Sequence, residues 1–160
     1  MKDNIAEFRK IFGDRILEKK EDLVPYMKDA SYFEGNIPMA AVIPKNSEEI
    51  SKLMKICSRE KIQVVMRSGG SALTGSPVPN EDSILISMSA MNRILETHLD
   101  DGYIVAEPGL RLDDLNNYLS KLGFFHVLEI GKNSSYLLWY GPDFKICLCY
   151  NSQCAFISCH

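Results

Sequence analysis

The sequence contains no long hydrophobic run, and this absence excludes an ordinary membrane-spanning helix. A helix needs about 18 consecutive apolar residues to cross a bilayer, and no stretch of the 160 residues provides them. The first 20 residues carry charges throughout, unlike a secretory signal peptide. We therefore expect a cytoplasmic protein without a transmembrane segment.

Clusters of lysine and arginine are also missing, and the formal net charge is −3 at pH 7. Nucleic-acid binding depends on cations that neutralise phosphates, so a nucleic-acid partner is not expected. The chain is 46% hydrophobic and 24% charged. This composition is typical of a globular protein that buries a core.

Cysteine is scarce in most of the chain and crowded at its end. Cys57 falls on the apolar face of an expected helix and fits a buried small hydrophobic residue. The other four cysteines lie in residues 147–159, separated by one, four and four residues. This spacing fits poorly the two C-x₂₋₄-C pairs of a zinc site, and nothing marks secretion. We expect neither a metal site nor a disulfide framework.

Hydrophobic spacing predicts an α+β fold. Residues 39–43 and 62–66 are apolar strand candidates, and between them a helix begins at Asn46 or Ser47. Strand, helix and strand with short links predict a parallel βαβ unit with a right-handed crossover. This unit is followed by antiparallel strands, and helices pack on the small mixed sheet. The further expected elements are a helix over 4–12, a strand over 83–88, a hairpin of 92–98 with 103–106, and a helix over 111–122.

A glycine-rich loop follows the second strand and reads Met66-Arg67-Ser68-Gly69-Gly70-Ser71-Ala72-Leu73-Thr74-Gly75-Ser76. Glycine lets the backbone approach a ligand closely, and successive N–H groups can form a nest that binds an anion. Such a loop suits a phosphate, although a mobile turn between strands has the same composition. The loop is no P-loop, because Gly75 is followed by Ser76-Pro77. It is no Rossmann fingerprint, because Pro77 and Pro79 leave no room for a helix.

The surrounding order of motifs narrows the interpretation. The relevant segments are Asp29-Ala30-Ser31, Ala41-Val42-Ile43-Pro44, the Arg67 loop and Val105-Ala106-Glu107-Pro108-Gly109. With this spacing, residues 20–125 resemble the N-terminal FAD-binding half of the vanillyl-alcohol oxidase (PCMH-type) flavoproteins. The chain is most similar to the branch of the glycolate oxidase subunit and D-lactate dehydrogenase.

The resemblance implies that the loop binds the pyrophosphate of FAD. The cofactor-binding residues that it implies are Arg67, Ser68, Gly69, Gly70, Ser71, Ala72, Thr74, Gly75, Ser76, Pro108, Gly109 and Leu110. For Arg67 two roles stay open, because it either balances the phosphate charge or braces the loop through a structural ion pair. Some members of the family attach the flavin covalently through a histidine where this chain has Ser71. FAD is therefore expected to bind non-covalently. The binding is expected to be weak, because only one of the family's glycine-rich cofactor segments is present.

No catalytic residue is expected. Asp100-Asp101 suits a turn, and Asp113-Asp114 lies in the first turn of a helix, where acids are favoured. His98 fits a surface position, and His126 is given no role. The resemblance implies that most substrate-binding and acid/base residues come from a C-terminal domain that this sequence lacks.

The character of the chain changes after Phe125. Residues 126–160 hold four charged residues, whereas the preceding 125 hold 35. The glycine motifs that the family would show next, T-x-G-G and N-x-G-G, are missing. We expect residues 1–125 to be a partial FAD-binding domain. Residues 126–160 are expected to be a divergent, cysteine-rich tail that is poorly ordered and arises from a reading-frame shift or a misjudged gene end.

Three functional hypotheses remain. The chain is a shortened flavoprotein oxidoreductase of the kind that oxidises 2-hydroxy acids such as glycolate and D-lactate, inactive alone or completed by a second chain. Alternatively, it is a nucleotide-binding or interaction module without redox activity, or a truncated product without function. Whether the purified chain carries a yellow chromophore distinguishes the first two from the third.

Overall fold

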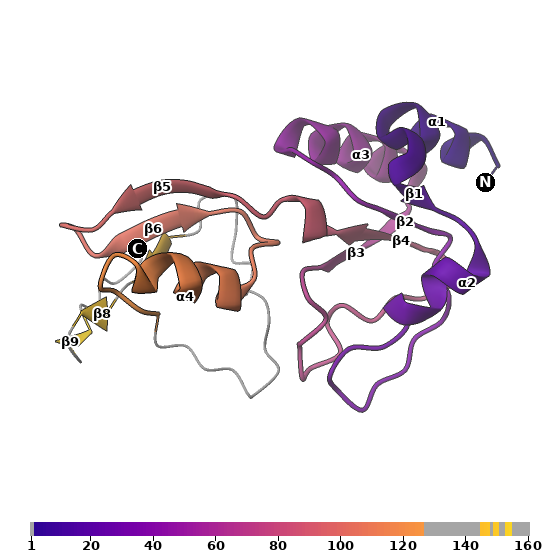
Figure 1. The fold of residues 1–160 in the computed structure, drawn as a ribbon. Helices are drawn as coiled ribbons and strands as arrows, with labels where there is room; N and C mark the ends of the chain where they lie inside the picture. The colour runs from indigo at the N-terminus through magenta and orange to yellow at the C-terminus, as the bar shows by residue number, and fades with distance from the viewer. Residues whose placement is uncertain (1, 127–144, 148, 151–152, 155–160) are drawn as a thin grey trace. The chain divides into compact units, whose positions relative to one another are not determined.

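The computed structural model describes residues 2–126 and the short segments 145–147, 149–150 and 153–154. The chain divides into two compact units, Met1–Ala90 and Met91–His160 (Figure 1). Among the described residues, no helix has the length and apolar character that a bilayer crossing requires.

The first unit is a small sheet with helices on it. Its helices are α1 (Lys2–Phe12), α2 (Lys20–Leu23) and α3 (Ser47–Glu60), and its strands are β1 (Ile16–Leu17), β2 (Ala40–Val42), β3 (Gln63–Arg67) and β4 (Ser83–Ser87). Short 3₁₀ turns span Gly13–Arg15, Val24–Tyr26 and Met88–Ala90. The predicted helix over 4–12 and the three strands over 39–43, 62–66 and 83–88 are therefore present with slightly shifted ends.

The strand order in this sheet is β1-β2-β4-β3. Both β2 and β3 pair with β4 in parallel, whereas β1 is antiparallel to β2. The two strands joined by α3 thus point the same way, as predicted, but β4 lies between them. The first unit is therefore parallel except at β1, and the α+β class with a small mixed sheet is confirmed.

Helix α3 shows why the sequence folds this way locally. The side-chain Oδ1 of Asn46 accepts a hydrogen bond from the N–H of Glu49 at 2.9 Å, which caps the helix as predicted. At the other end Lys61 takes a left-handed conformation with φ of 57°. The buried face includes Leu53, Ile56 and Cys57. Met54 follows Leu53 directly but is 42% exposed, because it lies one position away from the face of the helix that meets the sheet.

The core of the first unit lies on both faces of its sheet. On one face Leu23, Ala41, Val65 and Leu85 form a buried cluster. In Figure 1, α1 and α3 lie together on one side of this sheet, and α2 lies on the other. The strands β2 and β4 are buried along their whole length. Burial on both faces explains their apolar sequence.

The second unit is an antiparallel hairpin with one helix. Its hairpin strands β5 (Ile94–His98) and β6 (Tyr103–Ala106) pair antiparallel as predicted, and α4 spans Leu112–Ser120. The strand β7 (Lys145–Cys147) adds to β6, and β8 (Cys149–Tyr150) pairs with β9 (Gln153–Cys154). The core cluster of this unit includes Ile104, Leu115 and Leu119, all fully buried. The predicted disorder of residues 126–160 concerns a stretch that lies mostly outside the described residues, and it stays a prediction.

Candidate functional site: the glycine-rich loop

The glycine-rich loop begins where strand β3 ends. Arg67 is the last residue of β3, and residues 68–76 follow with neither helix nor strand. Because β3 runs parallel to β4, the loop lies at the carboxyl end of a parallel strand. Open α/β sheets bind their ligands at this edge. The predicted residues from Arg67 to Ser76 therefore form one continuous segment at the edge where such sheets bind ligands.

Two glycines of the loop adopt conformations that other residues avoid. Gly70 has φ of 69° and Gly75 has φ of 74°, both in the left-handed region. A side chain in this region costs roughly 1–2 kcal/mol. The glycines at 70 and 75 are thus required by the backbone path of the loop itself.

Arg67 lies against the loop that it precedes. Its Nη1 donates a hydrogen bond of 2.7 Å to the backbone oxygen of Lys28, and its Cζ is 5.7 Å from the centre of the Tyr26 ring. A Cβ built on Gly70 would lie 2.8 Å from Nε of Arg67 and closer still to Cζ and Nη2. The guanidinium therefore occupies the space beside Gly70.

A second segment, residues 33–36, packs against the far end of the loop. A Cβ on Gly75 would lie 2.7 Å from Cδ2 of Phe33, so the Phe33 ring covers that glycine. The N–H of Asn36 donates to the oxygen of Pro79 at 2.9 Å, and a Cβ on Gly35 would meet the same Pro79 oxygen. Residues 26–36 thus support the loop at both of its ends.

Sequence reasoning missed this supporting role of residues 26–36. The signal was present in Asp29-Ala30-Ser31, where Oδ1 of Asp29 accepts hydrogen bonds from the N–H and the hydroxyl of Ser31. The Ser31 Oγ in turn accepts from the N–H of Phe33 at 3.1 Å. These successive hydrogen bonds between neighbouring residues fix the backbone of Phe33. The other oxygen of Asp29 is buried and has no partner within the described part of the chain.

The loop residues are partly open to solvent. Residues 68–72 are half-buried, and Thr74 and Ser76 are exposed. Leu73 is 70% exposed. A Gly-rich backbone with accessible hydroxyl groups, a nearby cation at Arg67 and no acidic residue in its own sequence suits an anionic ligand. These residues fit a phosphate-containing cofactor.

The other predicted segment, Pro108-Gly109-Leu110, lies in the second unit between β6 and α4. The N–H of Gly109 donates to the oxygen of Met91 at 2.7 Å, and the N–H of Leu110 donates to the oxygen of Glu107 at 3.1 Å. Gly109 and Leu110 are buried, and Pro108 is half-buried. This segment is a well-bonded turn of its own unit.

The carboxyl group of Glu107 anchors this turn. Burial alone would raise the pKa of Glu107, but hydrogen bonds from the guanidinium and the N–H of Arg93 outweigh that effect and lower its pKa. Glu107 is therefore a structural carboxylate held in its charged form, and it does not have the raised pKa of a general acid.

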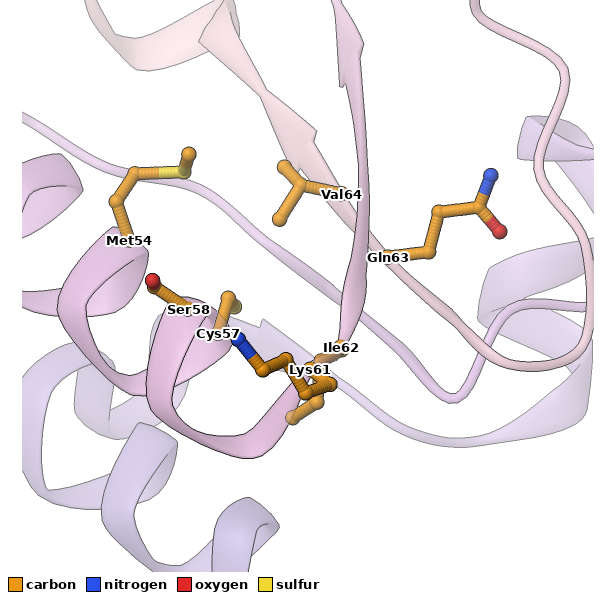
Figure 2. Close-up of a pocket in the computed structure, with 7 residues that line it drawn as sticks. All are labelled: Met54, Cys57, Ser58, Lys61, Ile62, Gln63 and Val64. Atoms are coloured by element: carbon orange, nitrogen blue, oxygen red, sulfur yellow. The ribbon is translucent and has the colours of Figure 1, made fainter.

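A separate pocket lies at the opposite end of β3 from the loop. It is lined by Met54, Cys57, Ser58, Lys61, Ile62, Gln63 and Val64 and has a volume of about 470 Å³ (Figure 2). Its residues come from the end of α3 and the start of β3. Burial raises the pKa of the Cys57 thiol to about 11, so this thiol is unreactive at neutral pH.

The histidine and carboxylate candidates form no acid/base constellation. His98 Nε2 is 2.9 Å from Oε2 of Glu96, and its ring stacks on Tyr103 at 4.5 Å between centroids. Arg111 pairs with Asp113 at 3.3 Å on the surface of α4. Among the described residues, no three His, Cys, Asp or Glu side chains come together as a metal site.

Residues 38–135 match the model of a protein family described as "FAD binding domain". The match covers more than half of the chain. The chain belongs to this family. FAD is therefore the cofactor of the domain. The match continues ten residues beyond Phe125, the residue at which the sequence resemblance ends.

Curated relatives identify the branch. D-lactate dehydrogenase [cytochrome] of Arabidopsis thaliana is 29% identical over 136 residues, which are 84% of this chain and 24% of the relative. D-2-hydroxyglutarate dehydrogenase of the same plant is also 29% identical, over 133 residues, 82% of this chain and 24% of the relative. The glycolate oxidase subunit GlcD of Bacillus subtilis is 30% identical over 101 residues, 63% of this chain and 22% of the relative. The chain spans about a quarter of the length of these relatives.

Solved structures agree with the fold. A crystal structure of p-cresol methylhydroxylase with substrate bound superposes with a TM-score of 0.68 at 27% identity, covering 76% of this chain and 24% of that one. An alkyldihydroxyacetonephosphate synthase gives a TM-score of 0.69 at 19% identity, covering 78% of this chain and 26% of that one. The resemblance to PCMH-type flavoproteins and to the D-lactate dehydrogenase and glycolate oxidase branch is confirmed.

Proposed function

We propose that the loop from Ser68 to Ser76 holds the pyrophosphate of FAD non-covalently, through its backbone N–H groups and hydroxyl groups. The observation that carries the proposal is the pair of left-handed glycines, Gly70 and Gly75, in a half-exposed loop at the carboxyl end of a parallel strand. Backbone N–H groups at such an edge bind phosphate without needing a particular side chain. The segment Pro108-Gly109-Leu110 stays a separate prediction of an FAD contact.

Within this proposal the chain binds and orients, and it supplies no group that reacts. When bound, FAD supplies the two-electron acceptor chemistry of flavoproteins, and the protein supplies binding and orientation. Ser71 occupies the position at which a histidine would allow covalent attachment, so the link stays non-covalent. No described residue is assigned a catalytic role.

For a longer protein or a complex that contains this domain, we propose the oxidation of a 2-hydroxy acid. The names of the relatives point to D-lactate, D-2-hydroxyglutarate and glycolate. The chain spans about a quarter of the length of such enzymes, and the proposal is that it is inactive by itself or completed by a second chain. The alternatives are a nucleotide-binding or interaction module without redox activity, and a product without function.

The test first asks whether the purified chain carries a yellow chromophore. The chain is then titrated with FAD while flavin fluorescence is recorded. We expect a dissociation constant in the micromolar range or weaker, because the chain offers only part of the contacts of a large ligand, and each lost ~1.4 kcal/mol weakens binding tenfold. Gly70→Val should abolish binding while circular dichroism stays unchanged. Equal binding by wild type and variant would show that the loop is not the site.

Dye reduction by D-lactate, D-2-hydroxyglutarate or glycolate then separates the redox proposal from the binding module. Reduction by the FAD-loaded chain supports the first, and FAD binding without reduction supports the second or an absent partner chain. The compartment is also part of the proposal. The sequence predicts the cytoplasm, whereas the plant relatives are named as mitochondrial, and fractionation of a tagged chain decides between them.

A further inference from the structure

We propose that Arg67 is a positioning residue. Its guanidinium packs against the glycine-rich loop at Gly70 and holds the loop in place, and it does not serve as the counter-ion of the cofactor phosphates. The inference rests on the proposed function of the loop, because it concerns how that loop is held. The sequence alone leaves the two roles of Arg67 open. The contacts of its side chain distinguish them.

The guanidinium contacts three parts of the first unit at once. Nη1 donates to the backbone oxygen of Lys28 at 2.7 Å, and the group lies 5.7 Å from the centre of the Tyr26 ring. Its Nε, Cζ and Nη2 lie where a Cβ of residue 70 would be. The plane of the group thus fills the space between the Tyr26–Lys28 segment and Gly70.

This packing makes residues 67 and 70 mutually dependent. A Cβ at residue 70 would lie 2.8 Å from Nε and nearer to Cζ and Nη2, distances at which one of the two groups must move. The left-handed φ of Gly70 is a second and independent reason for glycine at this position. Replacing Gly70 therefore has a cost from the backbone and a cost from Arg67, and only the second cost disappears when Arg67 is shortened.

A lysine cannot reproduce these contacts. The planar guanidinium presents donors along its edge and a flat face to an aromatic ring, whereas the lysine ammonium is a compact and strongly hydrated point charge. A lysine at residue 67 would keep the positive charge near the loop but lose the flat group beside Gly70. The two roles of Arg67 thus predict opposite outcomes for Arg67→Lys.

The first experiment needs no flavin. Hydrogen exchange of the amides of residues 68–76 is measured for wild type, Arg67→Lys, Arg67→Ala and Lys28→Ala. Lys28→Ala is the control, because it removes one positive charge and its ion pair with Glu34 from the supporting segment but keeps the backbone oxygen that accepts from Arg67. We expect about tenfold faster exchange in both Arg67 variants, a factor equivalent to about 1.4 kcal/mol, and no change in the control. If the loop amides of Arg67→Lys exchange at the wild-type rate, the bracing role of Arg67 is wrong.

The second experiment measures FAD affinity and its dependence on salt. We expect Arg67→Lys and Arg67→Ala to weaken binding by similar factors of about tenfold with the salt dependence of the wild type. A counter-ion role predicts that lysine restores affinity and that alanine reduces the salt dependence, and either result would overturn the proposal. If Arg67→Ala does not fold, the comparison of Arg67→Lys with Lys28→Ala decides alone.

A double mutant completes the test. Gly70→Ala is expected to weaken FAD binding by a smaller factor in the Arg67→Ala background than in the wild type, because the steric conflict is gone. Equal factors in the two backgrounds would contradict the packing. A wild type that binds no FAD at millimolar concentration would refute the proposed function of the loop, and the flavin-free exchange experiment would still decide the role of Arg67.

Discussion

Glu107 and Arg93 are joined by four hydrogen bonds that close a ring between backbone and side chains. The N–H of Glu107 donates to the oxygen of Arg93 at 2.9 Å. The carboxylate of Glu107 accepts from the N–H, Nε and Nη2 of Arg93 at 2.8, 3.1 and 2.7 Å. The Glu107 side chain is 6% exposed, whereas that of Arg93 is 68% exposed. The pair therefore ties the turn before α4 to the segment before β5.

This pair predicts a change in acid stability. The pKa of Glu107 is lowered in the folded chain, so the pair stabilises the fold above the unfolded pKa of about 4.3. That stability is lost as pH falls through the lower, folded pKa. Arg93→Ala removes the cation and leaves the burial, which raises the pKa of Glu107. The variant should therefore be less stable than the wild type at neutral pH, and it should lose less stability than the wild type as the pH falls.

Thermal melting between about pH 3 and pH 7, followed by circular dichroism, measures this change. The control is Arg59→Ala, which also removes one partly exposed arginine but leaves Glu107 paired. We expect the control to keep the acid profile of the wild type. An unchanged profile in Arg93→Ala would show that the ring contributes nothing to the charge state of Glu107.

Gly75 and Gly13 form a matched pair for measuring the packing of Phe33. Both have left-handed φ, 74° and 60°, but a Cβ on Gly13 meets nothing within 4 Å, whereas a Cβ on Gly75 meets the Phe33 ring at 2.7 Å. Gly13→Ala should cost about 1–2 kcal/mol of unfolding free energy from backbone strain alone. Gly75→Ala should cost about 1–3 kcal/mol more, since the ring must move.

Urea unfolding of the two variants measures the difference. Adding Phe33→Ala to Gly75→Ala should remove the extra cost, while adding it to Gly13→Ala should not bring the cost down. Equal costs for the two glycine variants would mean that the Phe33 ring yields without resistance.

The cap of α3 offers a third prediction. Asn46→Ala removes the oxygen that accepts from the N–H of Glu49 at 2.9 Å, and this loss should destabilise the fold by about 1 kcal/mol. Asn46→Asp keeps an acceptor at the helix start and should stay within a few tenths of wild type. Chemical denaturation measures both, and an alanine variant as stable as the aspartate variant would contradict the cap.

Cys57 should resist modification in the native protein. Cys57 is buried, and burial raises its pKa to about 11, so little thiolate exists at pH 8 to react with the reagent. In a variant whose other four cysteines are replaced by serine, iodoacetamide should label Cys57 at least about a hundredfold faster in urea than in buffer. Labelling at equal rates would show that α3 opens readily.

Local chemistry in the sequence was sufficient for several features. The cap at Asn46, the hairpin turn over residues 100–102 and the glycine-rich loop after β3 all depend on neighbours a few residues away. The family resemblance also followed from short motifs, and the match over residues 38–135 confirms it. Interactions within one turn or one loop leave a direct trace in residue order, so they could be predicted.

The sheet order and the support of the loop were decided only by tertiary structure. Nothing local indicates that β4 lies between β2 and β3, because that pairing joins residues far apart in the chain. The sequence by itself determined that a glycine-rich loop follows a parallel strand. Only the folded chain brought Lys28 and Tyr26 to Arg67, and Phe33 to Gly75, since contacts across some 40 residues depend on how whole elements pack and not on the spacing of any motif.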